Sequence, residues 1–176
     1  MAYGRPRLYP NNATRQRAYR ERHAEELLHL RQKLAIKVYH QSKRTTWETP
    51  PDVFAEYDAE FHFTLDVCAT AETAKCARFF SPEQNGLVQD WGDDVCWMNP
   101  PYGTQIAAWM EKAYRSSLAG ATVVCLVPAR TGTRWWHDWV LEKAELRLRK
   151  GRITFVGAPH PAGFDSVVVI YRPPER

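Results

Sequence analysis

The chain has 176 residues, of which 44% are hydrophobic and 12% aromatic, and it carries a formal net charge of +4. These values predict a globular protein with one main core. No apolar run approaches the ~18 residues of a membrane helix, and the N-terminus lacks the apolar stretch of a secretory signal. We therefore expect a cytoplasmic protein with no membrane partner. The four cysteines have no CxxC spacing, which predicts reduced thiols and no metal site.

The charge is distributed unevenly along the chain. Residues 1–46 carry eleven Lys or Arg and three Glu, a net charge of +8, whereas the remainder has a net charge of −4. A helix is predicted over about residues 13–42, because no Gly or Pro interrupts this region. We expect a basic helical arm over residues 1–45 that contacts nucleic acid; the alternative is a solvated helix that aids solubility. The candidate contacts in the arm are Arg15, Arg17, Arg20 and Arg22.

From Trp47 onward, predicted helices and strands alternate. Pro51 marks the start of a short helix in DVFAEYDAEF. Strands are predicted at Phe63–Cys68, Arg78–Phe80 and Val95–Met98, and a helix at Thr104–Leu118 that Gly120 ends. The unbroken apolar run Thr122–Val127 is typical of a strand covered on both faces. A helix follows at Thr133–Lys143, and the last strands are predicted in LRLRKG, RITFVG and SVVVIYRP, including an antiparallel hairpin.

This alternation predicts an open, mostly parallel α/β sheet, in which ligands bind beyond the carboxyl ends of the strands. Three strand ends carry unusual residues. They are Asp66–Thr70, Asn99–Tyr102 and Pro128–Arg130. We expect these segments to form one site at one edge of the sheet.

The segment Asn99-Pro100-Pro101-Tyr102 suits the chemistry of an aromatic amine. The lone pair of such an amine is delocalised, and two acceptors that hold its hydrogens would make the nitrogen a better nucleophile. Asn99 offers a side-chain carbonyl and Pro100 a backbone carbonyl, while the two prolines bring no competing N–H. An exposed Tyr102 ring would offer a stacking face. The plainer interpretation is a strand that leaves through a Pro-rich turn, with Tyr102 in ordinary packing.

This tetrapeptide resembles the catalytic loop of AdoMet-dependent amino-methyltransferases. The segments WETPPDVFAEY, LDVCATAETAKCARFF, NGLVQDW, WMNPPYG and KGRITF, in this order, resemble the small phage-encoded DNA N-6-adenine methyltransferases of the Dam type, over about residues 46–171. The resemblance implies a Rossmann-like methyltransferase fold over residues 46–176, with an abridged sheet. It also implies methyl transfer from S-adenosylmethionine to N6 of adenine in double-stranded DNA, with the base flipped out.

The resemblance also implies roles for single residues. The catalytic residues are Asn99, Pro100, Pro101 and Tyr102. The expected cofactor contacts are Trp47, Thr49, Pro50, Phe54, Asp66, Cys68, Ala69, Asp90 and Trp91. For Trp47 and Trp91, core packing is the alternative, and Asp66 or Asp90 could instead cap a turn. Beside the arm, the expected DNA contacts are Arg130, Arg134, Trp135, Arg152 and Phe155; surface solvation or core packing is the alternative for these.

One departure from the family pattern concerns the loop after the first strand. That loop is normally Gly-rich, whereas Asp66–Glu72 contains no glycine, so the cofactor cannot approach the backbone as closely. A non-catalytic DNA-binding relative is therefore one alternative function. The other is an amino-methyltransferase acting on RNA or on protein glutamine, because the basic arm does not distinguish DNA from RNA.

Overall fold

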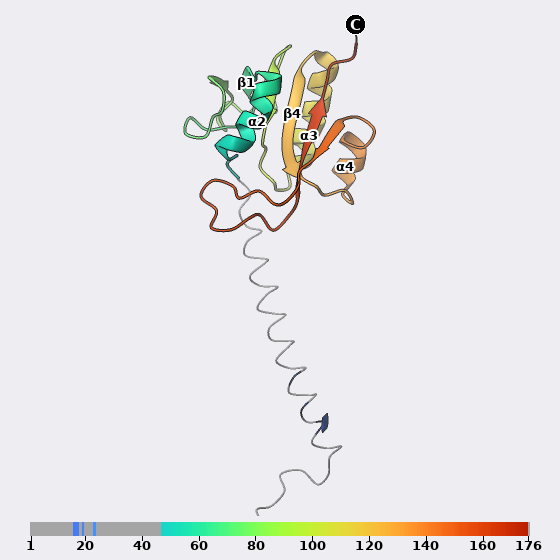
Figure 1. Ribbon diagram of the computed structural model, residues 1–176. Helices are drawn as coiled ribbons and strands as arrows, with labels where there is room; N and C mark the ends of the chain where they lie inside the picture. The colour runs from blue at the N-terminus through green and yellow to red at the C-terminus, as the bar shows by residue number, and fades with distance from the viewer. Residues whose placement is uncertain (1–15, 18, 20–22, 24–46, 176) are drawn as a thin grey trace, which may run out of the picture. The chain divides into compact units, whose positions relative to one another are not determined.

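The computed structural model describes Gln16, Arg17, Tyr19, His23 and residues 47–175 (Figure 1). The chain divides into two compact units, Met1–Lys43 and Arg44–Arg176. The four described residues of the first unit are helical. The rest of the helix predicted over residues 13–42 lies outside the described residues, and the boundary at residue 45 between arm and domain stays a prediction.

A six-stranded mixed sheet forms the centre of the second unit, in the order β2-β1-β3-β4-β6-β5. Its strands are β1 (Leu65–Asp66), β2 (Arg78–Phe79), β3 (Val95–Met98), β4 (Thr122–Pro128), β5 (Glu145–Leu148) and β6 (Ser166–Tyr171). β1 to β4 are parallel, whereas β6 is antiparallel to both β4 and β5. The mostly parallel sheet and its antiparallel C-terminal pair confirm the predicted fold class.

Three helices accompany this sheet, namely α2 (Pro51–Phe61), α3 (Ile106–Ala119) and α4 (Arg134–Trp139). α2 begins at a proline because the first turn of a helix needs no N–H donor. α3 packs against β4 and α4, and Figure 1 shows it behind β4. It ends at Gly120, whose φ of 132° favours glycine. α4 is shorter than predicted, and Glu142, with a φ of 60°, takes a left-handed conformation soon after it.

The core lies around the two longest strands. Every residue of β6 is buried, and so is every residue of β4 except Thr122. This burial confirms that the apolar run in β4 is covered on both faces, as its sequence predicted.

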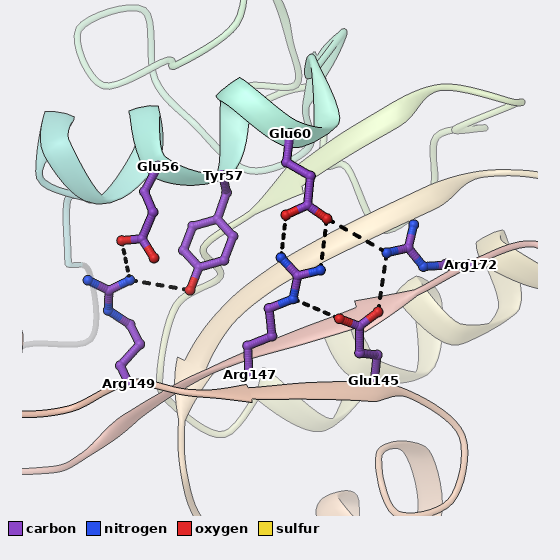
Figure 2. A network of polar contacts seen from close by, with 7 residues as sticks. All are labelled: Glu56, Tyr57, Glu60, Glu145, Arg147, Arg149 and Arg172. Atoms are coloured by element: carbon purple, nitrogen blue, oxygen red, sulfur yellow. Dashed lines mark hydrogen bonds and ion pairs between the residues drawn. The ribbon is translucent and has the colours of Figure 1, made fainter.

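An ion-pair network joins α2 to the edge strand β5 (Figure 2). Both terminal nitrogens of the Arg147 guanidinium donate to the Glu60 carboxylate, and its Nε donates to Glu145 at 2.7 Å. Arg149 pairs with Glu56 at 2.7 Å, and Arg172 completes the network by pairing with Glu145 at 3.2 Å. The charges also cover one side of an edge strand, which discourages pairing with another chain.

Residues 149–165, between β5 and β6, form no strand, so the strand predicted in RITFVG is wrong. Ile153 and Phe155 are buried and the residues beside them are exposed, which explains the strand-like sequence pattern. The backbone of this segment, however, pairs within the segment and with Glu48 rather than with a strand. The Ala162 amide donates to the Ile153 carbonyl at 2.9 Å, and the Val156 amide donates to the Glu48 carbonyl at 3.1 Å. This segment therefore packs beside residues 47–49 as a loop.

Among the described residues, no helix has the length and apolarity that a bilayer crossing requires. In the same part of the chain, no three His, Cys, Asp or Glu side chains gather as metal ligands would.

Candidate active site

A cavity of about 700 Å³ lies at the carboxyl ends of the parallel strands. Its walls come from the segments that follow β1, β2 and β3, together with residues 47–49 and the start of α3. The sequence-predicted residues that line it are Trp47, Thr49, Asp66, Cys68, Ala69, Asn99 and Pro101. The expected meeting of strand ends at one edge of the sheet is therefore confirmed for β1 and β3.

Asn99 follows β3 directly, and its side-chain amide is held by three hydrogen bonds. Nδ2 donates to the backbone carbonyl of Trp47 and to Oγ1 of Thr49, the latter at 3.0 Å. Oδ1 accepts from the Tyr102 hydroxyl at 2.7 Å. Because an amide has two donor hydrogens and two acceptor lone pairs, one lone pair of Oδ1 stays unused by these contacts. The carbonyl at Trp47 also determines the orientation of the amide, since a carbonyl can only accept.

Tyr102 is buried, with only 6% of its surface exposed, so the expectation of an exposed ring is wrong. Its ring makes edge-to-face contacts with Phe155 and Phe164, at centroid distances of 6.1 and 5.6 Å. Its hydroxyl lies 3.0 Å from the Leu126 carbonyl as well as near Asn99. One phenolic proton thus has two acceptors, and burial raises the pKa of this hydroxyl well above its ordinary value. Tyr102 therefore acts here as a neutral hydrogen-bond donor.

Asp66 ends β1 and organises the loop that follows. Its two carboxylate oxygens accept from the backbone amides of Cys68 at 3.3 Å and Lys75 at 3.1 Å. Burial raises the pKa of the Asp66 carboxyl, and the two N–H donors act in the opposite direction. The Asp66 carboxylate therefore holds this glycine-free loop through hydrogen bonds, and none of the loop residues has a positive φ.

Gly86 supplies a close backbone approach from a different segment. A Cβ at this position would lie 2.1 Å from the Val67 carbonyl oxygen and 3.2 Å from the Trp109 ring. The Gly86 carbonyl accepts from Nε1 of Trp91 at 2.9 Å. The glycine that allows close packing against Val67, just after β1, therefore comes from the turn before Trp91. The Asn-Gly pair predicts a turn here, but nothing in the sequence predicts the close approach of Gly86 to Val67.

Further cavity residues were not expected from the sequence. Lys75 and Glu48 form an ion pair at 3.3 Å between Nζ and Oε1, and both line the cavity. Trp109 also lines it, and its Nε1 is buried with no hydrogen-bond partner among the described residues. Trp109 lies in the helix predicted at Thr104–Leu118, and no sequence signal singled out either Lys75 or Trp109 as a ligand contact.

Four expected cofactor contacts do not line the cavity. Pro50 caps α2 through its carbonyl, and Phe54 packs edge-to-face on Trp97 at a centroid distance of 5.4 Å. The Asp90 carboxylate accepts from the Gly92 amide at 3.0 Å, which is the turn-capping alternative. Trp91 is only 1% exposed and packs in the core.

The expected DNA contacts divide into exposed and buried residues. Arg130, Arg134 and Arg152 are exposed; Arg134 pairs with Asp138, and Arg152 pairs with Asp165. Trp135 and Phe155 are buried, so their rings belong to the core. Arg17 is exposed, whereas Arg15, Arg20 and Arg22 lie outside the described residues.

Comparison with known proteins relates the chain to phage DNA methyltransferases. The chain is 35% identical over 119 residues to the DNA N-6-adenine-methyltransferase of Haemophilus phage HP1, an alignment that covers 66% of this chain and 69% of the phage protein. It is 30% identical over 151 residues to the enzyme of the same description from Escherichia phage T1, covering 73% and 63% of the two chains. The putative methyltransferase YfdM of Escherichia coli K12 is 31% identical over 90 residues, covering 46% and 94%.

The family model described as DNA N-6-adenine-methyltransferase (Dam) matches residues 38–172, most of the sequence. The chain therefore belongs to the Dam family of DNA N-6-adenine-methyltransferases, a family of adenine-specific DNA methyltransferases.

Proposed function

We propose that this protein transfers a methyl group from S-adenosylmethionine to the N6 amine of adenine in double-stranded DNA, in the cytoplasm. The observation that carries the proposal is the hydrogen bonding and the position of the Asn99 amide. It is oriented by three hydrogen bonds, keeps one acceptor position unused, and borders a cavity of about 700 Å³. An oriented neutral acceptor beside a ligand-sized cavity suits the capture of an amine.

The size and the polar lining of the cavity support S-adenosylmethionine as its ligand. Its volume lies within the range of roughly 300–1,000 Å³ found for small-molecule sites. Glu48 and Lys75 provide opposite charges for a ligand with an ammonium and a carboxylate, and Trp109 provides a buried N–H without a partner among the described residues. We expect these residues, with Asp66, to hold the cofactor. When bound, S-adenosylmethionine supplies an electrophilic methyl group.

Asn99 and Pro100 act on the amine. The unused lone pair of Asn99 Oδ1 and the Pro100 carbonyl accept its two hydrogens, which draws the nitrogen away from conjugation with the ring. Because Pro100 and Pro101 lack N–H groups and have fixed φ angles, they keep this acceptor in place before the base arrives. The buried Tyr102 contributes its hydroxyl, which orients Asn99.

The base must leave the duplex to reach this amide. The rings of Trp47 and Phe164 are half-buried and lie 5.6 Å apart between centroids, and the Phe164 ring also contacts Tyr102. We propose that they, in place of Tyr102, provide the ring surface that contacts the flipped base. Arg130, Arg134 and Arg152 are exposed and would contact phosphates, together with the arginines of the arm.

A labelled methyl-transfer assay against DNA, RNA and protein tests the proposal. We expect label in double-stranded DNA alone, and mapping of the methylated bases should place every label on adenine N6. Label confined to RNA or protein would show a different acceptor.

The loop without glycine favours one further candidate function, that of a DNA-binding relative that has lost the cofactor. Calorimetry with millimolar S-adenosylmethionine tests this candidate, and the absence of any heat of binding would support it.

Replacing Asn99 with Ala tests the residue that carries the proposal. We expect Asn99→Ala to bind S-adenosylmethionine with nearly unchanged affinity and to lose about 10²-fold or more in turnover, because an oriented acceptor for the amine is gone. Calorimetry and single-turnover kinetics on the same preparation measure the two quantities. Turnover at the wild-type rate would contradict the two-acceptor mechanism.

A further inference from the structure

We propose that Thr49 is a positioning residue, which holds the Asn99 amide through its hydroxyl and is not needed for cofactor affinity. This inference rests on the proposed function of Asn99. Thr49 was expected from the family resemblance to contact the cofactor, whereas in the structure its Oγ1 receives a hydrogen bond from Asn99 Nδ2 at 3.0 Å.

The first argument is the geometry of the amide. A free Asn side chain can exchange its oxygen and nitrogen by rotation about its last bond, and only one orientation presents the oxygen to a substrate amine. The Trp47 carbonyl takes one Nδ2 hydrogen and Thr49 takes the other. Rotation would place Oδ1 against the Trp47 carbonyl, so two acceptors would face each other without a proton. Residues 47–49 therefore select the productive orientation.

The second argument is that Thr49 is itself held in place. Only 2% of its surface is exposed. On one side, Pro50 has a φ of −60° and caps α2. On the other side, the Glu48 carbonyl accepts from the Val156 amide at 3.1 Å, and the Trp47 ring packs on Phe155 at a centroid distance of 5.2 Å. A buried hydroxyl on a short segment held at both ends is well suited to fix a neighbouring group.

Two conservative changes separate the hydroxyl from the methyl group of Thr49. Thr49→Val keeps the shape and removes the acceptor, whereas Thr49→Ser keeps the acceptor and removes the methyl group. We expect Thr49→Val to lower the single-turnover rate at saturating cofactor and DNA by about 10- to 100-fold, because a misplaced catalytic group reacts slowly. The affinity for S-adenosylmethionine, measured by calorimetry, should not change. Thr49→Ser should keep the wild-type rate.

Nuclear magnetic resonance gives a readout that does not depend on turnover. The side-chain NH₂ pair of Asn99 is identified by its loss in Asn99→Ala. Thr49→Val should shift one of the two hydrogens of this pair, and Thr49→Ser should leave both in place. This comparison also holds if the wild-type protein transfers no methyl group, so failure of the proposed function and failure of this inference can be told apart.

Two results would overturn the inference. One is a Thr49→Val protein with weaker cofactor binding and an unchanged saturated rate, which would make Thr49 a cofactor contact. The other is a Thr49→Val protein with an unchanged rate and unchanged Asn99 resonances. If Thr49→Val does not fold, Thr49→Ala compared with Thr49→Ser provides the same test of the hydroxyl.

Discussion

Asn99 shows how much of this site depends on the chemistry of one amide group. Its contact with the Trp47 carbonyl needs a donor, because a carbonyl can only accept, and its contact with the Tyr102 hydroxyl uses an acceptor. Only a side chain with both kinds of atom makes these two contacts while it also donates to the Thr49 hydroxyl. Aspartate has nearly the same size and shape, but its ionised form has no donor. Replacing Asn99 with Asp therefore changes the hydrogen bonding at this position and hardly changes the shape.

We expect Asn99→Asp to lower the free energy of unfolding at pH 7 by roughly 1–3 kcal/mol, because a carboxylate oxygen would face the Trp47 carbonyl. Only the protonated carboxyl can donate to that carbonyl, so the pKa of the new group should lie above its ordinary value. The loss is then full above the raised pKa and shrinks as the pH falls toward the unfolded value of about 3.9.

Urea unfolding at pH 7 and pH 5 measures this loss. Asn99→Ala is the matched control, because it removes the amide without adding a titratable group, and its loss should not depend on this change of pH. A stability difference between Asn99→Asp and wild type that stays constant with pH would show that residues 47–49 do not discriminate between amide and carboxylate.

At the scale of elements, the site is made of short segments that follow strands. β1 has only two residues, yet its carboxyl end meets both the loop closed by Asp66 and the turn that contains Gly86. The backbone approach of Gly86 to Val67 brings these segments together. The loop after β1 can therefore border the cavity without a glycine of its own, because Gly86 allows the close approach from the neighbouring turn.

Gly86→Ala tests this packing. The added Cβ would lie 2.1 Å from the Val67 carbonyl oxygen, which belongs to backbone and cannot rotate away. We expect a loss of roughly 1–3 kcal/mol in the free energy of unfolding, as for other overpacked sites, together with weaker cofactor binding. Gly132→Ala is the control, because a Cβ there meets no atom within 4 Å. A Gly86→Ala protein as stable as the Gly132→Ala protein would contradict the close approach.

At the scale of the whole molecule, the parallel strands place Arg130, a proposed DNA contact, and the Asn99 amide at the same edge of the sheet. Arg130 follows β4 by two residues, and Asn99 follows β3 directly. Arg78, in contrast, begins β2 and pairs with Asp94, so it lies at the opposite edge of the sheet. The topology therefore places the exposed residues Arg130 and Arg78 at opposite edges of the sheet, a difference that the sequence alone does not predict.

We expect Arg130→Ala to weaken DNA binding and to reduce the slope of log affinity against log salt concentration by about 1, because one phosphate contact is lost. Arg78→Ala should leave the slope unchanged. Fluorescence titrations of labelled duplex DNA at several salt concentrations measure both. Equal effects of the two variants would indicate that DNA binding does not depend on this edge of the sheet.

The sequence by itself determined the alternation of strands and helices, the buried strand at Thr122–Val127 and the motif at Asn99–Tyr102. These signals are local, because periodicity and turn residues act over a few positions. Only the tertiary structure decided that Tyr102 is buried, that RITFVG is a loop, and that Thr49 and Trp47 hold Asn99. Such contacts join residues some fifty positions apart, 50 for Thr49 and 52 for Trp47, and hydrogen bonding between distant segments leaves no pattern in either one.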